Sequence, residues 1–299
     1  MRDADRSSSA RIDPRFAADV LLMTAADERV ATQAVLALLS AARSTSRPVR
    51  CVLLADEVHP SQVAHAHDRF EAAGIPFEIV AIDPAPLEGL RTDEPWGRAA
   101  NARLLLTREL HESAPRTLYL DTDTLTVGSL DELLDVDLQG MPLAAVADET
   151  VPVVSAGAAG VVHWRALGIP PATAYFNSGV LLIDNERWEA ERLGERTMEL
   201  LRDYPREGSF PDQGALNAAI AGRWLPVDAR WNLQIRGARG IAVSGWVLSR
   251  AGVSRAREGA ILHFTGGKKP WHRSYARGPA RDAYIAGWKQ HLPDIPFPM

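Results

Sequence analysis

The chain has 299 residues, of which 46% are hydrophobic and 24% are charged, a composition typical of a globular protein. Its formal net charge of −5 gives no overall attraction to nucleic acid or to an anionic membrane, so an anionic ligand has to be bound by a local site. The single cysteine, Cys51, excludes a disulfide framework and lies in an apolar run, where a buried strand position is expected.

The N-terminal residues 1–15 are polar and charged, with no apolar segment of the kind found in signal peptides, and we expect them to form a disordered leader. No stretch of the sequence reaches the roughly 18 consecutive apolar residues of a membrane span. No repeat, low-complexity segment or shift in composition divides the remainder, so residues 16–299 are predicted to form one domain. These features favour a cytoplasmic protein without an integral membrane segment.

Strands and helices alternate through the first third of the chain. Three apolar runs have strand composition and the two segments between them have helical composition; in chain order these are residues 19–24, 31–43, 49–55, 61–73 and 76–82. Such alternation predicts an α/β fold with a doubly wound, parallel sheet.

A second strand signal is followed at once by two carboxylates. Residues 99–109 are predicted to form a helix that carries Arg103, and the apolar run 116–120 then leads to Asp121 and Asp123. In an extended backbone the two acids share a face, and a hard divalent cation that can also hold a diphosphate is one reason to bring them together. The same pattern fits solvated turn residues at a strand end, so the motif alone leaves both interpretations open.

Acids also end two other predicted strands. Asp27 follows the first apolar run, and Asp148 ends the run 143–147. Ligands of doubly wound sheets bind beyond the carboxyl ends of the strands. We therefore expect Asp27 and the pair formed by Asp121 and Asp123 to converge on one crevice.

A longer strand is predicted at residues 174–184. The irregular, apolar stretch 151–171 before it is long for a loop and is expected to cover the crevice as a lid. Asp184 or Asn185 is expected to cap a helix that runs to about Arg202.

A shorter helix opens at Pro211, where Asp212 fits equally well as a capping residue or as a site residue. The following segment, residues 235–259, is rich in glycine and basic. It is interpreted either as a solvated loop or as a loop that attracts an anion, and its basic residues are Arg236, Arg239, Arg250, Arg255 and Arg257.

A motif with a histidine, glycines and lysines follows the last predicted strand. The strand delivers His263, the pair Gly266 and Gly267 frees the backbone for a close approach, and Lys268 and Lys269 supply charge suited to phosphate. A histidine at a strand end is more often structural than a ligand. The adjoining glycines and lysines, in a chain that also has two spaced aspartates, favour the ligand interpretation here.

From about Asp19 to His272 the sequence resembles the family 8 glycosyltransferases, retaining hexosyltransferases that include glycogenin and bacterial lipopolysaccharide galactosyl- and glucosyltransferases. The resemblance implies a single GT-A type domain for nucleotide-diphospho-sugars, with a Rossmann-like, mainly parallel central sheet flanked by helices. Four blocks in the same order carry it: residues 118–123 (LYLDTD), 175–183 (YFNSGVLLI), 212–217 (DQGALN) and 263–271 (HFTGGKKPW).

The resemblance implies that Mn²⁺, with Mg²⁺ as a second possibility, bridges the phosphates of a UDP-sugar. Its ligands are then Asp121, Asp123 and His263, while Gly266 and Lys269 hold the diphosphate. These roles agree with the chemistry of each residue type.

The remaining roles are carried over in the same way. The resemblance places Ala25 and Asp27 near uracil, and Thr122 among the substrate-binding residues. It places Arg103, Asp148 and Asn177 around the donor sugar. A catalytic group is implied against the sugar ring and the leaving diphosphate, comprising Asp148, Asp212, Gln213 and Lys269.

The implied reaction moves a hexose, galactose or glucose, to the hydroxyl of an acceptor that the sequence does not identify. Breaking the sugar–diphosphate bond builds negative charge that a metal and Lys269 can stabilise, and positive charge that Asp148 and the amide oxygen of Gln213 can stabilise. A departing phosphate oxygen can accept the proton of the acceptor. Double displacement through Gln213 or Asp212 is the alternative route.

Two departures from the family pattern support a rival interpretation. Val30 stands where the family often has an aromatic residue that stacks on uracil, and Gly214 replaces an acid that commonly follows the Asp–Gln pair. A sugar-nucleotide-binding protein without transfer activity is therefore one alternative. The other is a phosphatase of the haloacid dehalogenase type, but Leu125 departs from its motif and about 120 residues precede the acid pair.

Overall fold

The structure is a computed structural model that describes residues 18–90, 98–105, 113–204, 211–236 and 260–298, with the short strands β10 (Ala242–Val243), β11 (Trp246–Ser249) and β12 (Gly252–Val253). The predicted leader lies outside the described residues, as do the basic positions 239, 250, 255 and 257. No helix in the described ranges is long and apolar enough to cross a membrane.

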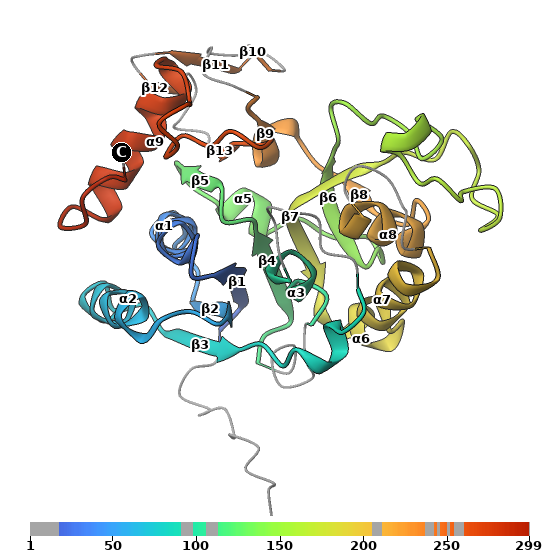
Figure 1. Ribbon diagram of the computed structural model, residues 1–299, viewed down its shortest axis with the longest axis horizontal. Coiled ribbons are helices and arrows are strands. Elements are labelled where there is room, and N and C mark those ends of the chain that lie inside the picture. The colour runs from blue at the N-terminus through green and yellow to red at the C-terminus, as the bar shows by residue number, and fades with distance from the viewer. Residues whose placement is uncertain are drawn as a thin grey trace, which may run out of the picture.

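A seven-stranded sheet, in the order β3-β2-β1-β4-β7-β6-β8, forms the centre of the molecule (Figure 1). β7 runs antiparallel to both of its neighbours, and the other described pairs in this sheet are parallel, which confirms the prediction of a mainly parallel sheet. The strands are β1 (Val20–Asp27), β2 (Val49–Asp56), β3 (Phe77–Ala81), β4 (Arg116–Leu120), β6 (Leu143–Ala147), β7 (Phe176–Asp184) and β8 (Leu225–Pro226).

The strand order reverses between β1 and β4. From β1 the chain moves outward to β2 and β3, and it then returns to the other side of β1 with β4. A reversal of this kind opens a crevice at the carboxyl ends of the two strands. Asp27 ends β1 and Asp121 follows β4, so both acids lie at the reversal.

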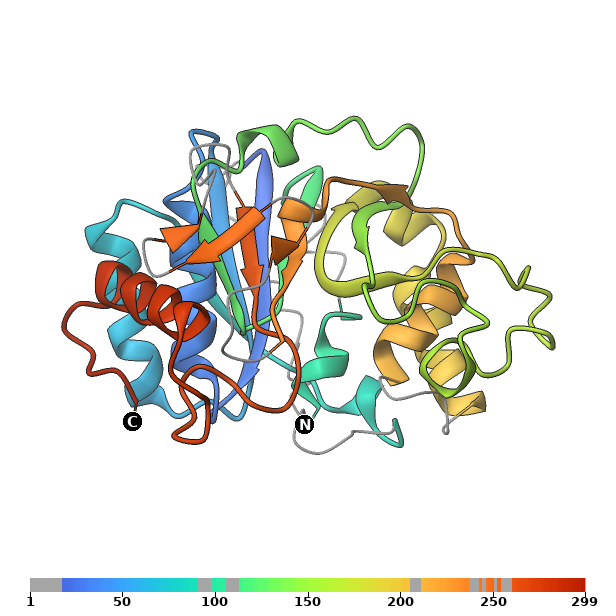
Figure 2. The ribbon, with the colours of Figure 1, turned by 90° about the horizontal axis from the view of Figure 1, so that it is seen from above.

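Helices cover both faces of the sheet (Figures 1 and 2). One core contains residues of α1, α2, α5 and α9, and the other contains residues of α3, α6, α7 and α8. The bounds are α1 (Ala31–Ala42), α2 (Pro60–Ala72), α3 (Ala99–Ala102), α5 (Asp131–Leu134), α6 (Asn185–Ala190), α7 (Leu193–Asp203), α8 (Pro211–Ile220) and α9 (Pro279–His291).

The apolar strands follow from this double cover. Successive side chains of a strand point to opposite faces, so Leu22 of β1 packs in the first core while Leu21 and Met23 pack in the second. Because both faces are buried, the strand is apolar at nearly every position rather than at alternate ones. That continuous pattern is what allowed the strands to be predicted.

A smaller sheet carries the histidine to the crevice. Its strands lie in the order β5 (Thr124–Val127), β13 (Ala260–His263) and β9 (Leu233–Gln234). β13 is antiparallel to β5 and parallel to β9. The short strands β10 to β12 form a separate three-stranded sheet.

Two predicted elements differ in the structure. Asp184 does cap a helix, because its carboxylate accepts from the backbone N–H of Arg187 at 3.0 Å, but Arg192 adopts a left-handed conformation at φ 51° and separates α6 from α7. The predicted helix at 99–109 is described as helical only over α3, and residues 106–112 lie outside the described ranges.

The stretch 151–171 is not a lid in this structure. Val151, Val154, Val161 and Ile169 pack around Tyr175 in a small core of their own. No residue of the stretch lines the cavity described below. Its apolar character is therefore explained by burial rather than by covering a ligand.

Candidate active site

The two spaced aspartates lie in a tight turn between β4 and β5, not in the extended backbone expected from the sequence. The backbone N–H of Thr124 donates to the carbonyl of Asp121 at 3.1 Å, and the Thr124 hydroxyl donates to the same oxygen at 2.8 Å. The backbone N–H of Asp121 donates to Gly179 of β7 at 2.8 Å. The turn is thus fixed to the central sheet, and it still brings both carboxylates to one side.

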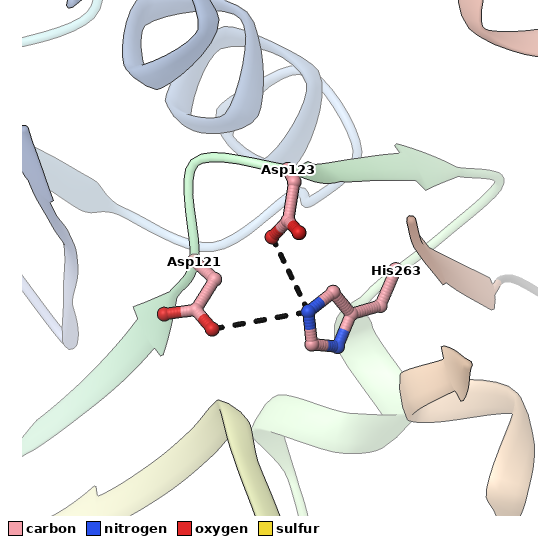
Figure 3. A group of neighbouring side chains, drawn as sticks. All are labelled: Asp121, Asp123 and His263. Carbon is pink, nitrogen blue, oxygen red and sulfur yellow. Dashed lines mark ion pairs between the residues drawn. The ribbon is translucent and has the colours of Figure 1, made fainter. Parts of the chain in front are cut away.

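β13 places His263 opposite this turn. His263 pairs with Thr124 across the two strands, and the backbone N–H of Phe264 donates to the carbonyl of Asp123 at 2.9 Å. His263 Nε2 lies 3.2 Å from Asp123 Oδ1 and 3.8 Å from Asp121 Oδ2 (Figure 3). One ligand atom from each of the three residues lies within 4.8 Å of the others.

These residues fit a divalent cation. Two carboxylates from the turn after β4 and an imidazole from the end of β13 form a donor set of oxygen and nitrogen atoms suited to such an ion. Gly179 makes the convergence possible, because a Cβ atom there would lie 2.2 Å from His263 Cε1 and 2.9 Å from Asp121 Oδ2. The strand β7 therefore passes behind the ligands at a distance that only glycine permits.

Lys269 lies against the same group. It is 5% exposed, its ammonium bonds Asp123 Oδ2, and it donates to the carbonyl of Phe264 at 2.9 Å. Burial opposes the charge on Asp123, but Lys269 and His263 outweigh it and hold the pKa of the Asp123 carboxyl below its ordinary value. Gly266, at φ 90°, supplies the left-handed turn that returns the chain toward this site.

Arg103 links the acid turn to α8. Its guanidinium lies 3.2 Å from Asp121 Oδ1 and 3.0 Å from Asp212 Oδ2, and it donates to the Ser178 carbonyl at 2.7 Å. The Tyr119 hydroxyl donates to the same Asp121 oxygen at 2.9 Å. Burial raises the pKa of the Asp212 carboxyl, although Arg103 acts in the opposite direction.

Asp148 is held by hydrogen bonds from several donors. Asn177 Nδ2 donates to its Oδ2 at 3.1 Å and Gln213 Nε2 at 3.3 Å, while the backbone N–H groups of Thr150 and Val151 donate to Oδ1. Burial works to raise the pKa of Asp148, but these hydrogen bonds outweigh it and lower that pKa. The side chain is thus a fixed carboxylate.

Gln213 faces differently from what the sequence led us to expect. Its amide oxygen accepts from the Ser178 backbone N–H at 3.0 Å and from the Ser178 hydroxyl at 3.3 Å. Its amide nitrogen donates to Asp148. In this structure the amide oxygen of Gln213 therefore bonds α8 to β7 rather than facing the cavity as a free acceptor.

At the other end of the crevice, Asp27 is engaged by Arg29. The backbone N–H of Arg29 donates to Asp27 Oδ1 at 2.9 Å, and its guanidinium lies 2.6 Å from Oδ2. The Arg29 side chain is 49% exposed and lines the same cavity as Val30 and Ala25. A charged, half-exposed arginine side chain thus lies beside the position where the family often has an aromatic ring.

The candidate site residues surround one cavity of about 310 Å³. Its lining includes the residues to which the sequence analysis gave a catalytic, substrate-binding or metal-binding role: Ala25, Asp27, Arg103, Asp121, Thr122, Asp123, Asp148, Asn177, Asp212, Gln213, His263, Gly266 and Lys269. Their individual roles remain predictions, but the structure brings them together. Lys268, which was also considered for phosphate, is exposed and does not line the cavity.

Comparison with known proteins agrees with this arrangement. Residues 20–274 match the family described as glycosyl transferase family 8. The chain belongs to this family. The identification from the four sequence blocks is therefore confirmed, and the enzyme is a family 8 glycosyltransferase.

Relatives cover most of the chain at low identity. General stress protein A of Bacillus subtilis is 28% identical over 243 residues, which are 80% of this chain and 82% of that protein. Lipopolysaccharide 1,3-galactosyltransferase of Salmonella typhimurium is 27% identical over 216 residues, which are 68% of this chain and 59% of that protein. The match thus spans less than two thirds of the Salmonella enzyme.

A solved structure has the same fold. The galactosyltransferase LgtC, in complex with donor and acceptor sugar analogs, is 22% identical, with a TM-score of 0.68 over 91% of this chain and 100% of that chain. At this identity the similarity supports the fold alone. It confirms the predicted α/β architecture of the family 8 domain.

Sequence reasoning missed four polar residues of the family 8 site. Tyr119 and Ser178 hold other side chains, and Arg236 lines the cavity and donates to the Thr150 hydroxyl at 2.9 Å. Asn232 lies beside His263. Arg236 was noted only as part of a basic loop. Tyr119 and Ser178 lie within two of the sequence blocks but were given no role, although Tyr119 bonds Asp121 only two residues away. Asn232 carries no local signal, because its partners His263 and Asn177 are distant in sequence.

Proposed function

We propose that the protein is a metal-dependent, retaining hexosyltransferase that takes galactose or glucose from a UDP-sugar and transfers it to a hydroxyl acceptor. The observation that carries this proposal is the convergence of Asp121, Asp123 and His263 on the cavity wall, with Lys269 bonded to one of the acids. A cation held by these side chains, together with the lysine ammonium, would attract a diphosphate to the point where the strand order reverses between β1 and β4.

The three converging side chains would hold the ion, with Mn²⁺ favoured over Mg²⁺ because mixed carboxylate and imidazole ligation suits it better. When bound, such an ion supplies positive charge that stabilises the leaving diphosphate. Lys269 and the backbone at Gly266 would act on the same group. Lysine is a compact positive charge, and the left-handed glycine allows the backbone to approach phosphate closely.

The groups near the donor sugar would bind and orient it. Asp148 is an ionised carboxylate held by Asn177 and Gln213, so it can face positive charge developing on the sugar without moving. Asp212 is paired with Arg103. Because Asp148, Asp212 and Gln213 all have partners in the protein, the structure supports binding roles for them better than nucleophilic attack.

A departing phosphate oxygen would then accept the proton of the acceptor hydroxyl on the same face of the sugar, which gives retention. The names of two relatives support a hexose as the group transferred. They are lipopolysaccharide 1,3-galactosyltransferase and, at 27% identity over 195 residues, lipopolysaccharide 1,2-glucosyltransferase of Escherichia coli. The acceptor would be a saccharide, a lipid-linked glycan or a small molecule.

Release of free hexose from a panel of UDP-sugars, measured without acceptor, tests this proposal. We expect slow release that requires Mn²⁺, stops in excess chelator and is lost in Asp123→Asn. Circular dichroism of that variant should show an intact fold, because Asp123 belongs to the site rather than to the apolar core. UDP binding that persists undiminished in chelator would overturn metal dependence. Tight binding of UDP-sugar with no release of hexose would favour the rival, a binding protein without transfer activity.

A further inference from the structure

Buried amide side chains connect the histidine of the site to Asp148. Asn232, at the end of the short 3₁₀ helix η4 (Ala229–Asn232), is 1% exposed. Its Oδ1 lies 2.8 Å from His263 Nδ1, and its Nδ2 donates to Asn177 Oδ1 at 2.9 Å. Asn177 Nδ2 in turn donates to Asp148 Oδ2 at 3.1 Å.

The orientation of each amide follows from groups that have only one hydrogen-bonding role. The backbone N–H of Gly179 can only donate, and it lies 3.1 Å from Asn177 Oδ1. An ionised Asp148 carboxylate can only accept, so the Asn177 nitrogen must face it. Asn232 must then turn its nitrogen toward Asn177, which leaves its oxygen against His263.

An acceptor against Nδ1 selects one tautomer of His263. The proton of the neutral ring must lie on Nδ1, and the lone pair is then on Nε2. Nε2 is the atom that faces Asp123 Oδ1 at 3.2 Å and Asp121 Oδ2 at 3.8 Å. The Asn232 oxygen thus leaves the correct nitrogen available as a ligand.

We propose that Asn232 is a positioning residue of the cation site, which fixes the ring orientation and tautomer of His263 so that Nε2 is available to the metal. The inference rests on the proposed metal dependence and extends it to a residue outside the ligand set. It also joins the cation site to the sugar-facing carboxylate, because Asn177 and Asp148 determine how Asn232 is oriented.

The backbone around Asn232 is suited to such a role. Asp228 caps η4 by accepting from the Arg230 backbone N–H at 2.9 Å, and β9 continues from η4 alongside β13. The backbone N–H of Ile235 donates to the His263 carbonyl at 2.7 Å. Asn232 thus directly precedes β9, which is hydrogen-bonded to the strand that ends in His263.

The affinity for Mn²⁺, measured by electron paramagnetic resonance of the free ion, tests the role of Asn232. Asn232→Leu has a similar volume but no acceptor, and we expect binding about 10- to 100-fold weaker, the usual effect of losing a partner of a metal-bound histidine. Asn232→Asp keeps an acceptor toward His263 Nδ1 but loses the donor to Asn177 Oδ1, so its Mn²⁺ affinity should fall by clearly less than that of Asn232→Leu. If circular dichroism shows that the leucine variant is unfolded, Asn232→Ala can be used for the same measurement.

A double-mutant cycle distinguishes positioning from a general structural effect. In a His263→Ala background, Asn232→Leu should have no further effect on Mn²⁺ affinity, because its action passes through the missing ring. The matched control is Asn185→Leu. Asn185 is also 1% exposed, but its side chain donates to the Ala114 carbonyl. It follows the last residue of β7, whereas Asn177 lies near the first, so it is a buried asparagine away from the site.

The outcomes separate this inference from the proposed function. The positioning role would be overturned if Asn232→Leu lost no more Mn²⁺ affinity than Asn185→Leu. It would also be overturned if the loss in Asn232→Leu were as large in the His263→Ala background as in the wild type. Metal dependence would stand in both cases. A loss in Asn232→Asp as large as in Asn232→Leu would also overturn the positioning role. Failure of the wild-type chain to bind Mn²⁺ would remove the proposed metal dependence and the inference together.

Discussion

Two adjacent lysines differ in surroundings. Lys269 is buried against Asp123 and the Phe264 carbonyl, whereas Lys268 is exposed. If Lys269 acts as charge builds on the leaving diphosphate, Lys269→Ala should lower turnover by roughly one to three powers of ten, as removal of one oxyanion donor does. Lys268→Ala should have little effect. Rates with two UDP-hexoses check this, and equal small losses for both variants, or a switch of donor preference in Lys269→Ala, would refute the assignment.

Two buried glycines give a second contrast between single residues. In Gly179→Ala the new Cβ would clash with two of the proposed ligands, at 2.2 Å from His263 Cε1 and 2.9 Å from Asp121 Oδ2, so we expect loss of Mn²⁺ binding and activity. In Gly214→Ala the nearest atom to the new Cβ is 3.8 Å away, and alanine in a helix should stabilise the protein by about 0.5 to 1 kcal/mol. Calorimetric metal titration and thermal unfolding of both variants measure these effects. Unchanged Mn²⁺ affinity in Gly179→Ala would contradict the proposed position of the ion.

The packing of α9 on α1 makes stability depend on pH. His291, at the end of α9, is 5% exposed and its Nδ1 lies 3.5 Å from the Arg43 guanidinium. Burial, and then the charge of Arg43, lower the pKa of His291 from 6.5 to about 4. As the pH falls below about 6.5, His291 gains a proton in the unfolded chain, but in the folded chain it does so only near pH 4. Proton binding therefore favours the unfolded chain between these values, and the free energy of unfolding decreases as the pH falls from about 6.5 to about 4.

At pH 4.5 the loss amounts to about 2 to 3 kcal/mol relative to pH 7. Other groups titrate over the same range, so the test compares wild type with His291→Gln, which keeps an acceptor for Arg43 but cannot gain a charge. Urea unfolding at pH 7 and at pH 4.5 should show a smaller decrease in the free energy of unfolding for the variant. An equal decrease in both proteins would contradict the assignment to His291.

The predictability of individual elements followed from their burial. β1, β2 and β6 were found because strands covered on both faces are apolar throughout, and α1 because its helical propensity is high. The left-handed Arg192 was missed because nothing in its side chain marks such a backbone conformation. The antiparallel direction of β7 was also missed, since it depends on how the long segment before it returns to the sheet.

The predictability of the site divides in a similar way. The motif residues that were given a catalytic, substrate-binding or metal-binding role, such as Asp121 and Lys269, line the cavity. The motifs could not predict which side chains of different motifs bond to one another. The bonding of Lys269 to Asp123 joins residues 146 positions apart, and Asn232 reaches Asn177 from 55 positions away. Such contacts are set by the assembled sheet rather than by local sequence.

At the scale of the whole molecule, the cavity gathers residues from Ala25 to His272 around the point where the strand order reverses. The family match ends at residue 274, but the fold continues into α9. α9 packs beside α1 in the same core as β5 and β13, the strands that carry the site (Figure 1). We therefore expect the segment beyond the family match to be needed for the site.

Truncation at each end of the chain tests this expectation. Removal of residues 1–17 should leave thermal stability and activity unchanged, because both the family match and the central sheet begin at Val20. Removal of residues 276–299 should prevent stable folding. It deletes Tyr284, Trp288 and Leu292, each at most 2% exposed, and uncovers Phe264, whose ring centroid lies 5.1 Å from that of Tyr284.

Burying three such side chains contributes about 1.5 to 3 kcal/mol each, a large part of the roughly 5 to 15 kcal/mol by which a domain is stable. Circular dichroism melting and UDP-hexose hydrolysis of both truncated chains give the comparison. A C-terminal truncation that melts cooperatively near the wild-type temperature and remains active would show that α9 is an addition to the fold. Loss of folding in that variant alone would show that the sheet bearing His263 depends on α9, because Phe264 follows the histidine directly and packs against that helix.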